Sequence, residues 1–219
     1  MIGLMLLCEK DHFKNMKEGD FTDVDVYKSV FDKHNGIIKL SDFTANGFHN
    51  TELNKLIEMG LVEKIKTGYY EWIDGDIVSD AVLIRKLFPE GVVCLDSALY
   101  LYGYTERTPS AWHIAVSKNR KKSKYNIKYP PMQFYFLIDD YMKIGLSEIM
   151  FEGHPMTIFD RDRTICDVIR YELKMDKEVF NYAIKTYVKD SKKNIRNLLD
   201  YAEMMNIKNK VSRIIGMWM

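Results

Sequence analysis

Residues 37–73 read IIKLSDFTANGFHNTELNKLIEMGLVEKIKTGYYEWI, and glycine separates the apolar patterns within this stretch. The spacing predicts a short helix over 41–45, which Ser41 caps and Asn46-Gly47 ends. A longer helix then runs to Gly60. We expect this helix to start at Asn50 or Thr51. Its buried stripe consists of Leu53, Leu56 and Ile57.

The elements on either side of this helix pair are also predicted. An amphipathic helix precedes it, capped by Thr22 or Asp23 and ended by Asn35-Gly36. The strand-like runs 61–65 and 69–73 follow it, and the Lys66-Thr67-Gly68 turn between them predicts a hairpin. Helix, short helix, turn, helix and hairpin in this order are typical of a winged helix-turn-helix.

The open face of the third helix favours DNA as the ligand, because its side chains are hydrogen-bonding types that can read base edges. Other polar residues lie at the start of the second helix and at the wing tip, where they can hold phosphates. Together we expect these DNA contacts: Lys39, Ser41, His49, Asn50, Thr51, Asn54, Lys55, Lys64, Lys66 and Thr67.

Charge leaves an alternative open for this module. Residues 1–75 hold nine Lys or Arg and thirteen Asp or Glu, so their overall field does not attract DNA. A winged helix can instead bind protein as an adaptor, and His49 can serve as a helix cap instead of a base reader.

The chain as a whole has 219 residues and a net charge of +1, which excludes a globally basic binder and an acidic disordered tail. We expect an α+β protein with an N-terminal arm over 1–20, a winged helix-turn-helix over 21–75 and a mixed α/β domain over 76–219. Met16 is an alternative start of the chain, and the apolar residues 1–8 are too short to span a membrane.

The pattern within 76–219 mixes helices and strands. It predicts a helix over 77–87, strands over 112–117 and 133–137, and a hairpin over 144–159 that turns at 153–155. Four closing helices are expected over 164–174, 176–189, 195–205 and 208–217. We expect the domain to end in a helical bundle.

A run of basic residues interrupts this second domain between two apolar segments. It is either a solvated loop or a second surface that binds phosphates or serves antitoxin activity. Its members are Lys118, Arg120, Lys121, Lys122, Lys124 and Lys128.

Several stretches resemble the AbiEi family of antitoxins. They are Leu95-Asp-Ser-Ala-Leu-Tyr-Leu-Tyr-Gly-Tyr-Thr, Pro109-Ser-Ala-Trp-His-Ile-Ala-Val, Phe159-Asp-Arg-Asp-Arg-Thr-Ile-Cys-Asp-Val-Ile and Tyr201-Ala-Glu-Met-Met-Asn-Ile. The resemblance runs from about residue 22 to the end of the chain and keeps these motifs in the family's order.

The resemblance implies a bacterial phage-defence protein of an abortive-infection, type IV toxin–antitoxin operon. Its winged helix would bind inverted repeats in its own promoter and repress transcription. Its second domain would counter a nucleotidyltransferase-like toxin without a stable complex. We expect a cytoplasmic protein that is not an enzyme and binds neither cofactor nor membrane.

Catalysis is the third hypothesis, because Asp160 and Asp162 could hold Mg²⁺ for phosphoryl transfer and Asp139-Asp140 is another acidic pair. No glycine-rich phosphate loop accompanies them, and an ion pair of Arg163 with Asp167 explains that helix more simply. The three cysteines have neither zinc nor disulfide spacing, so we expect no metal site.

Overall fold

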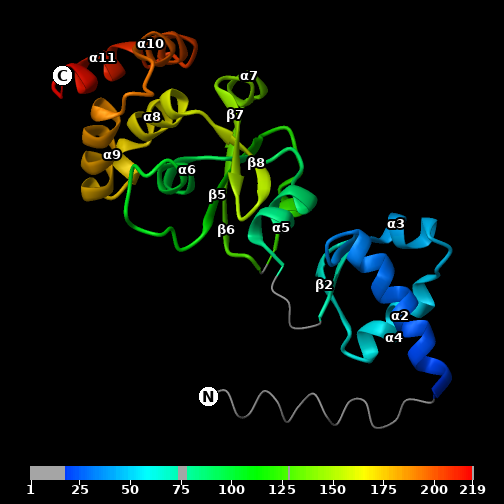
Figure 1. Cartoon of the computed structure of the whole chain (residues 1–219). Helices are drawn as coiled ribbons and strands as arrows, with labels where there is room; N and C mark the ends of the chain where they lie inside the picture. Colours follow the sequence, from blue (N-terminus) through cyan, green and yellow to red (C-terminus); the bar gives the residue numbers. More distant parts are fainter. Residues whose placement is uncertain (1–17, 74–77, 128, 219) are drawn as a thin grey trace. The chain divides into compact units, whose positions relative to one another are not determined.

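A computed structural model describes residues 18–73, 78–127 and 129–218, with side chains from Val24 onward. The chain separates into two compact units, and the division lies between Leu87 and Phe88 (Figure 1). The sequence pattern placed it after residue 75. The difference arises because Lys86 donates hydrogen bonds to backbone carbonyls of the first unit, at 2.7 Å in the case of Ile37.

The first unit contains a winged helix-turn-helix, as expected. Its elements are α2 (Glu18–Lys33), β1 (Ile37–Lys39), α3 (Leu40–Ala45), α4 (Asn50–Glu58), β2 (Val62–Lys66), β3 (Tyr69–Trp72) and, after the described residues resume, α5 (Asp80–Leu87). The strands form an antiparallel sheet in the order β1-β3-β2. The hairpin turns at Gly68, whose φ of 78° suits a glycine.

Three predicted helix starts in the first unit are wrong. The first helix begins at Glu18, so Thr22 and Asp23 lie within it and do not cap it, and it crosses the predicted domain start at residue 21. A polar first turn carries no apolar period, so the sequence pattern missed it. α3 begins at Leu40, and the Ser41 hydroxyl donates to the Asp42 carboxylate instead of capping the helix. The helix predicted over 77–87 begins at Asp80 among the described residues.

The core of this unit is aromatic. The Phe31 ring centroid lies 5.4 Å from that of Trp72, and those of Phe43 and Phe48 are 5.2 Å apart. Helices and sheet bury the following side chains together: Val30, Phe31, Ile38, Phe43, Leu53, Leu56, Val62 and Trp72. Two of the three predicted stripe residues of α4 are therefore buried, while Ile57 is partly buried.

The second unit has a mixed five-stranded sheet in the order β6-β5-β4-β8-β7. Its strands are β4 (Val92–Val93), β5 (Trp112–Ser117), β6 (Met132–Leu137), β7 (Leu146–Phe151) and β8 (His154–Phe159). The strand predicted over 112–117 is confirmed. The last hairpin turns at Glu152-Gly153, so 154 and 155 already belong to β8.

Helices pack against this sheet and against one another (Figure 1). They are α6 (Leu95–Leu101), α7 (Asp139–Met142), α8 (Arg161–Arg170), α9 (Lys177–Lys189), α10 (Ile195–Met204) and α11 (Lys208–Gly216), with short 3-10 turns at Lys122–Tyr125 and Glu172–Lys174. α8 contacts α6, α9, α10 and α11. It begins at Arg161 instead of 164, because Asp160 caps it.

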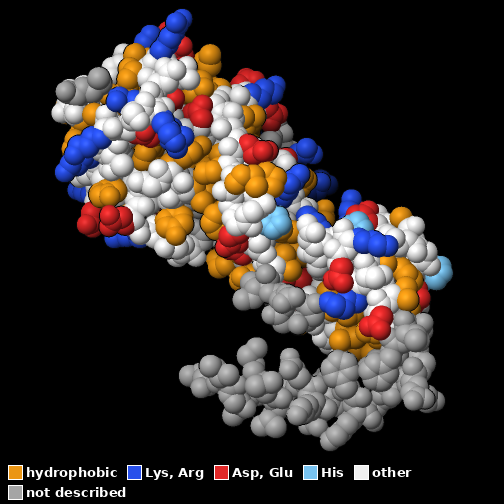
Figure 2. All heavy atoms as spheres, viewed as in Figure 1, with side chains coloured by type: hydrophobic (Ala, Val, Ile, Leu, Met, Phe, Trp, Pro, Cys, Tyr) orange, Lys and Arg blue, Asp and Glu red, His pale blue; other side chains and the backbone are white. Residues whose placement is uncertain are grey.

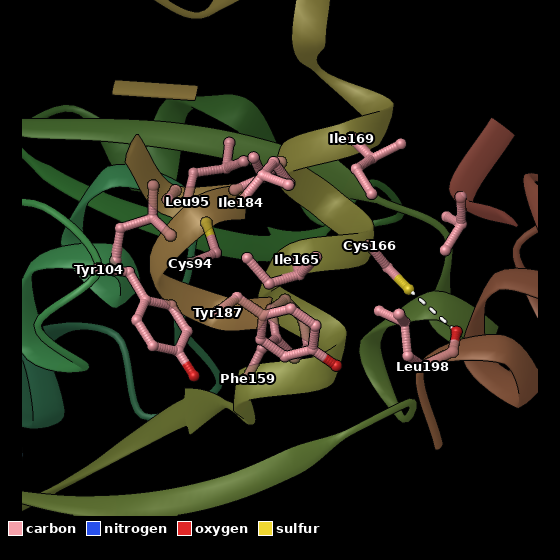
Figure 3. Packing of buried hydrophobic residues seen from close by; sticks show 14 of the residues in the cluster. Cys94, Leu95, Tyr104, Phe159, Ile165, Cys166, Ile169, Ile184, Tyr187 and Leu198 are labelled. Carbon is pink, nitrogen blue, oxygen red and sulfur yellow. Dashed lines mark hydrogen bonds between the residues drawn. The ribbon is translucent and has the colours of Figure 1, made fainter. Parts of the chain in front are cut away.

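Cys94 and Cys166 are buried free thiols in this core, and the Cys166 sulfur contacts the Leu198 carbonyl oxygen at 3.4 Å (Figure 3). Cys8 lies outside the described residues. No helix in the described part of the chain is long and apolar enough to cross a membrane.

Arg163 is fully buried at the centre of the second unit. It donates to both carboxylate oxygens of Asp167, at 3.1 and 3.2 Å, which confirms the expected ion pair. Its remaining nitrogen donates to the backbone carbonyls of Tyr141 and Ile144, and its guanidinium lies 4.2 Å from the Phe159 ring centroid. The buried charge is therefore paired, and it ties α8 to the segment before β7.

Gly145 tests this close packing. Its φ is 66°, and a Cβ at this position would lie 2.5 Å from Cβ of Arg163. We expect Gly145→Ala to lower the free energy of unfolding by about 2–6 kcal/mol, because backbone strain and overpacking each cost about 1–3 kcal/mol.

Gly153→Ala is the matched control in chemical denaturation. Its φ of 79° carries similar backbone strain, but an added Cβ would meet nothing within 4 Å. Equal losses in the two variants would contradict the packing argument.

Candidate nucleic-acid interface

One face of α4 is exposed and free. Asn50, Thr51, Asn54 and Lys55 lie on this face, and the structure shows all four side chains exposed. Within the described part of the chain, none of them makes a hydrogen bond or ion pair. On the opposite side Leu53 is 1% exposed and anchors the helix in the aromatic core. The four residues thus form one polar stripe, which we call the α4 stripe.

The N-terminus of α4 lies beside a shallow open pocket. The turn from α3 passes through Gly47, whose φ of 91° is left-handed, and places Thr44 and Phe48 next to His49. Among the described residues, the backbone N–H groups of Asn50 and Thr51 have no acceptor. Free N–H groups at a helix N-terminus suit a phosphate oxygen.

Glu52 holds α4 in place. Its carboxylate accepts the backbone N–H of His49 at 2.5 Å and the hydroxyl of Tyr27 on α2 at 2.8 Å. These two hydrogen bonds lower the pKa of Glu52 below its ordinary value. One of the two acidic side chains of α4 is thereby engaged with α2, while the other, Glu58, is exposed. His49 occupies the N-cap position and its side chain is exposed, so capping and a base contact are compatible.

This role of Glu52 was not predicted from the sequence. The available signal is the acidic residue three positions after the N-cap, which is typical of a capping box. His49 at the cap obscured it, because histidine is not among the preferred N-cap residues.

The two lysines predicted to contact phosphate from the wing, Lys64 and Lys66, differ in availability. Lys64 is exposed and pairs with Tyr70, which packs on the helix side of the sheet. The strand register shifts between Lys64 and Lys66. Lys66 is half-buried, and its ammonium donates to the Leu87 carbonyl at 2.6 Å. We therefore remove Lys66 from the interface, while Thr67 at the turn remains exposed.

The strand β1 brings Lys39 close to the wing turn. Leu40 N–H donates to the Gly68 carbonyl at 2.9 Å, and Lys39 lies opposite Tyr69 in the sheet. Lys39 and Ser41 are both exposed. The start of α3 and the wing turn are thus adjacent parts of one polar edge.

Acidic side chains are distributed unevenly over the sheet. Glu63 and Glu71 are direct cross-strand partners in the row of Ile37, whereas Lys64 belongs to the neighbouring row with Tyr70. Because successive residues of a strand point to opposite faces, the two glutamates lie on the sheet face away from Lys64. On the molecular face in Figure 2, acidic and basic side chains are interspersed over this unit.

The basic run of the second unit is an ordered loop. Tyr125 is buried, stacks on Phe88 and contacts Phe134, and its hydroxyl donates to Glu90 at 3.1 Å. The ammonium of Lys122 lies 5.4 Å from the Phe136 ring centroid. The sixth predicted residue, Lys128, lies outside the described residues. The other five side chains are exposed: Lys118, Arg120, Lys121, Lys122 and Lys124.

The Asp160 and Asp162 carboxylates are engaged in structural hydrogen bonds. Asp160 caps α8 by accepting the Arg163 N–H at 2.8 Å, and it also accepts the Tyr201 hydroxyl. Asp162 is buried and accepts the Tyr187 hydroxyl at 2.7 Å, as well as a backbone N–H. In the described ranges no group of three or more His, Cys, Asp or Glu could hold a metal ion.

Asp139 of the second predicted acidic pair and the nearby His113 also have structural partners. Asp139 accepts hydrogen bonds from Ser117 and Asn119, which shape the start of the basic loop. His113 lies half-buried beside Tyr135, and its ring Nδ1 is 3.3 Å from the tyrosine oxygen. These hydrogen bonds give Asp139 and His113 a structural role, so no bound ligand is needed to explain them.

Comparison with known proteins adds a fold relationship. No protein-family model and no curated protein matches the chain. The structure is similar to a crystal structure of the RV2827C protein from Mycobacterium tuberculosis, with a TM-score of 0.63 over 87% of this chain and 79% of that chain. The two sequences are 11% identical, so the similarity establishes the fold alone.

The hydrogen bond from the Tyr27 hydroxyl to Glu52 leads to a prediction about stability. Tyr27→Phe should lower the free energy of unfolding by about 0.5 kcal/mol at pH 7, the low end for a hydrogen bond because the pair is partly exposed. Because the folded-state pKa of Glu52 is lowered, this contribution is present above its ordinary pKa of 4.5 and is lost as the pH falls through the folded value.

Urea denaturation of both proteins at pH 7 and at pH 3 measures the difference. Tyr70→Phe is the control, because no hydrogen bond of the Tyr70 hydroxyl is present in the described part of the chain. A deficit of Tyr27→Phe that grows on acidification would contradict the assignment.

Proposed function

We propose that this protein represses its own promoter by binding inverted-repeat operator DNA through the winged helix, and that its second unit acts as the antitoxin of a phage-defence operon. The α4 stripe is the observation that carries the DNA-binding part. Four exposed hydrogen-bonding side chains without internal partners lie on a helix of the size that enters a major groove.

Phosphate contacts supply the affinity in this proposal. Lys39 and Lys64 are exposed cations of the first unit, and the free N–H groups at the start of α4 add a neutral phosphate site. Since residues 1–75 carry excess acid, these few contacts must overcome a weak overall field. The basic loop of the second unit is a further candidate for phosphates or for antitoxin activity.

The antitoxin part rests on the resemblance to the AbiEi family. The motifs at 95–105, 109–116 and 159–169 include most of α6, β5 and α8, and α6 contacts both β5 and α8 in the second unit. By this resemblance the partner is a nucleotidyltransferase-like toxin that is countered in the cytoplasm without a stable complex. We propose a non-enzymatic role without a cofactor, because the Asp160 and Asp162 carboxylates already serve as structural hydrogen-bond acceptors.

A protein-binding adaptor is the alternative, favoured by the acidic excess of the first module. Salt dependence separates the two, because phosphate contacts weaken steeply with salt and a protein interface weakens much less.

We expect the purified chain to bind DNA from upstream of its own reading frame more tightly than an unrelated duplex. Asn54→Ala should cost about 1–3 kcal/mol on the operator, through loss of a base contact. Lys64→Ala should weaken binding to both duplexes and reduce the salt slope by about 1. Gel-shift titrations at several salt concentrations measure both effects.

Three variants serve as controls. Asn181→Ala and Lys185→Ala alter exposed positions of α9 in the second unit, and Lys66→Ala removes an ammonium that binds Leu87. All three should leave the salt slope unchanged. Salt-insensitive binding, or equal affinity for both duplexes, would refute the operator model.

A further inference from the structure

We propose that the operator is A·T-rich, with Asn50 and Asn54 selecting adenine, Thr51 contacting a thymine methyl group and Lys64 entering a narrow minor groove. This inference rests on the proposed DNA-binding function and names the base sequence that the α4 stripe prefers.

The first argument is the absence of arginine from the module. The first arginine of the chain is Arg85, after the winged helix, so the α4 stripe and the wing contain none. Arginine and lysine both read guanine, but only the guanidinium of arginine offers two parallel N–H donors in a fixed fork that matches the base. Lys55 is the remaining cation on the stripe, and its single ammonium acts as a point charge without the fixed fork of a guanidinium.

The second argument is the pair of free amides. Asn50 and Asn54 are four residues apart, so they project from the same face of α4 about 6 Å apart along its axis. That distance covers about two base-pair steps of 3.4 Å. Each amide offers a donor and an acceptor, which match N6 and N7 of adenine. Both side chains are exposed and without internal partners in the described residues, so both are available.

Thr51 supports the same preference. It is exposed directly beside Asn50, and its methyl group suits the C5-methyl of thymine, which only an A·T pair presents in the major groove. Leu53 is buried in the core and Glu52 is held by Tyr27, so neither competes for a base.

The wing argument is electrostatic. A-tracts have a narrow minor groove with enhanced negative potential, which attracts lysine. The hairpin tip at Thr67-Gly68 is small, and a Cβ at Gly68 would meet nothing within 4 Å. Lys64 is exposed on the same hairpin. The exposed ammonium of Lys64 gains more from a more negative groove, which again favours A·T-rich sequence.

Selection from a random-sequence duplex library tests the inference. The purified full chain is bound to the library, and the recovered duplexes are sequenced against the unselected pool to remove composition bias. We expect an enriched A·T-rich motif. Asn54→Ala should reduce the preference for adenine at one position by about 5- to 150-fold, and Asn181→Ala should leave the motif unchanged.

A gain-of-specificity variant guards against a simple folding defect. Asn54→Arg should shift the preference at that same position from adenine to guanine, and circular dichroism melting verifies that each variant is folded. A shifted base preference requires a folded protein, so it supports direct readout by this residue.

The remaining outcomes separate two failures. An enriched G·C-rich motif, or an A·T-rich motif that neither Asn50→Ala nor Asn54→Ala alters, would overturn this inference and leave the DNA-binding function standing. Recovery of no motif at low salt would overturn the proposed function as well.

Discussion

The carboxylate of Glu52 is the point on which the proposed interface depends. It accepts the N–H of His49 at the start of α4 and the hydroxyl of Tyr27 on α2, so one side chain sets both the start of the helix and its position against the core. With Leu53 and Leu56 buried in the core, α4 presents the α4 stripe and the acidic Glu58 at its last turn to solvent. Glu52 adds to the negative charge of the first unit, but its carboxylate also orients the α4 stripe, whose side chains would bind DNA.

In the second unit, too, charged side chains hold secondary-structure elements together. Arg163 is fully buried and its donors are distributed between Asp167 and two backbone carbonyls, while Asp160 and Asp162 accept tyrosine hydroxyls. The Asp-Arg-Asp-Arg stretch therefore joins α8 to its neighbours. Asp160 and Asp162 have the spacing of a metal-binding acidic pair, but each carboxylate already accepts hydrogen bonds from donors within the protein.

These observations reconcile an acidic module with a polyanionic ligand. Net charge governs the field at a distance, whereas binding in a groove depends on groups within hydrogen-bond reach. Glu52 is held by α2, and the pair Glu63 and Glu71 lies on the sheet face away from Lys64. Glu58 remains an exposed carboxylate on α4, so the α4 stripe, Lys39 and Lys64 must outweigh its charge when DNA binds.

The sequence by itself determined the winged-helix order, the strand over 112–117 and the identity of the α4 stripe, because apolar periodicity and glycine turns are local signals. Only the tertiary structure decided which lysines are available and where the first unit ends. The hydrogen bonds of Lys66 to Leu87 and of Lys86 to Ile37 join residues far apart in the chain, and no periodic pattern encodes such pairs. The starts of α2 and α8 were misplaced for a related reason, since a polar first turn carries no apolar signal.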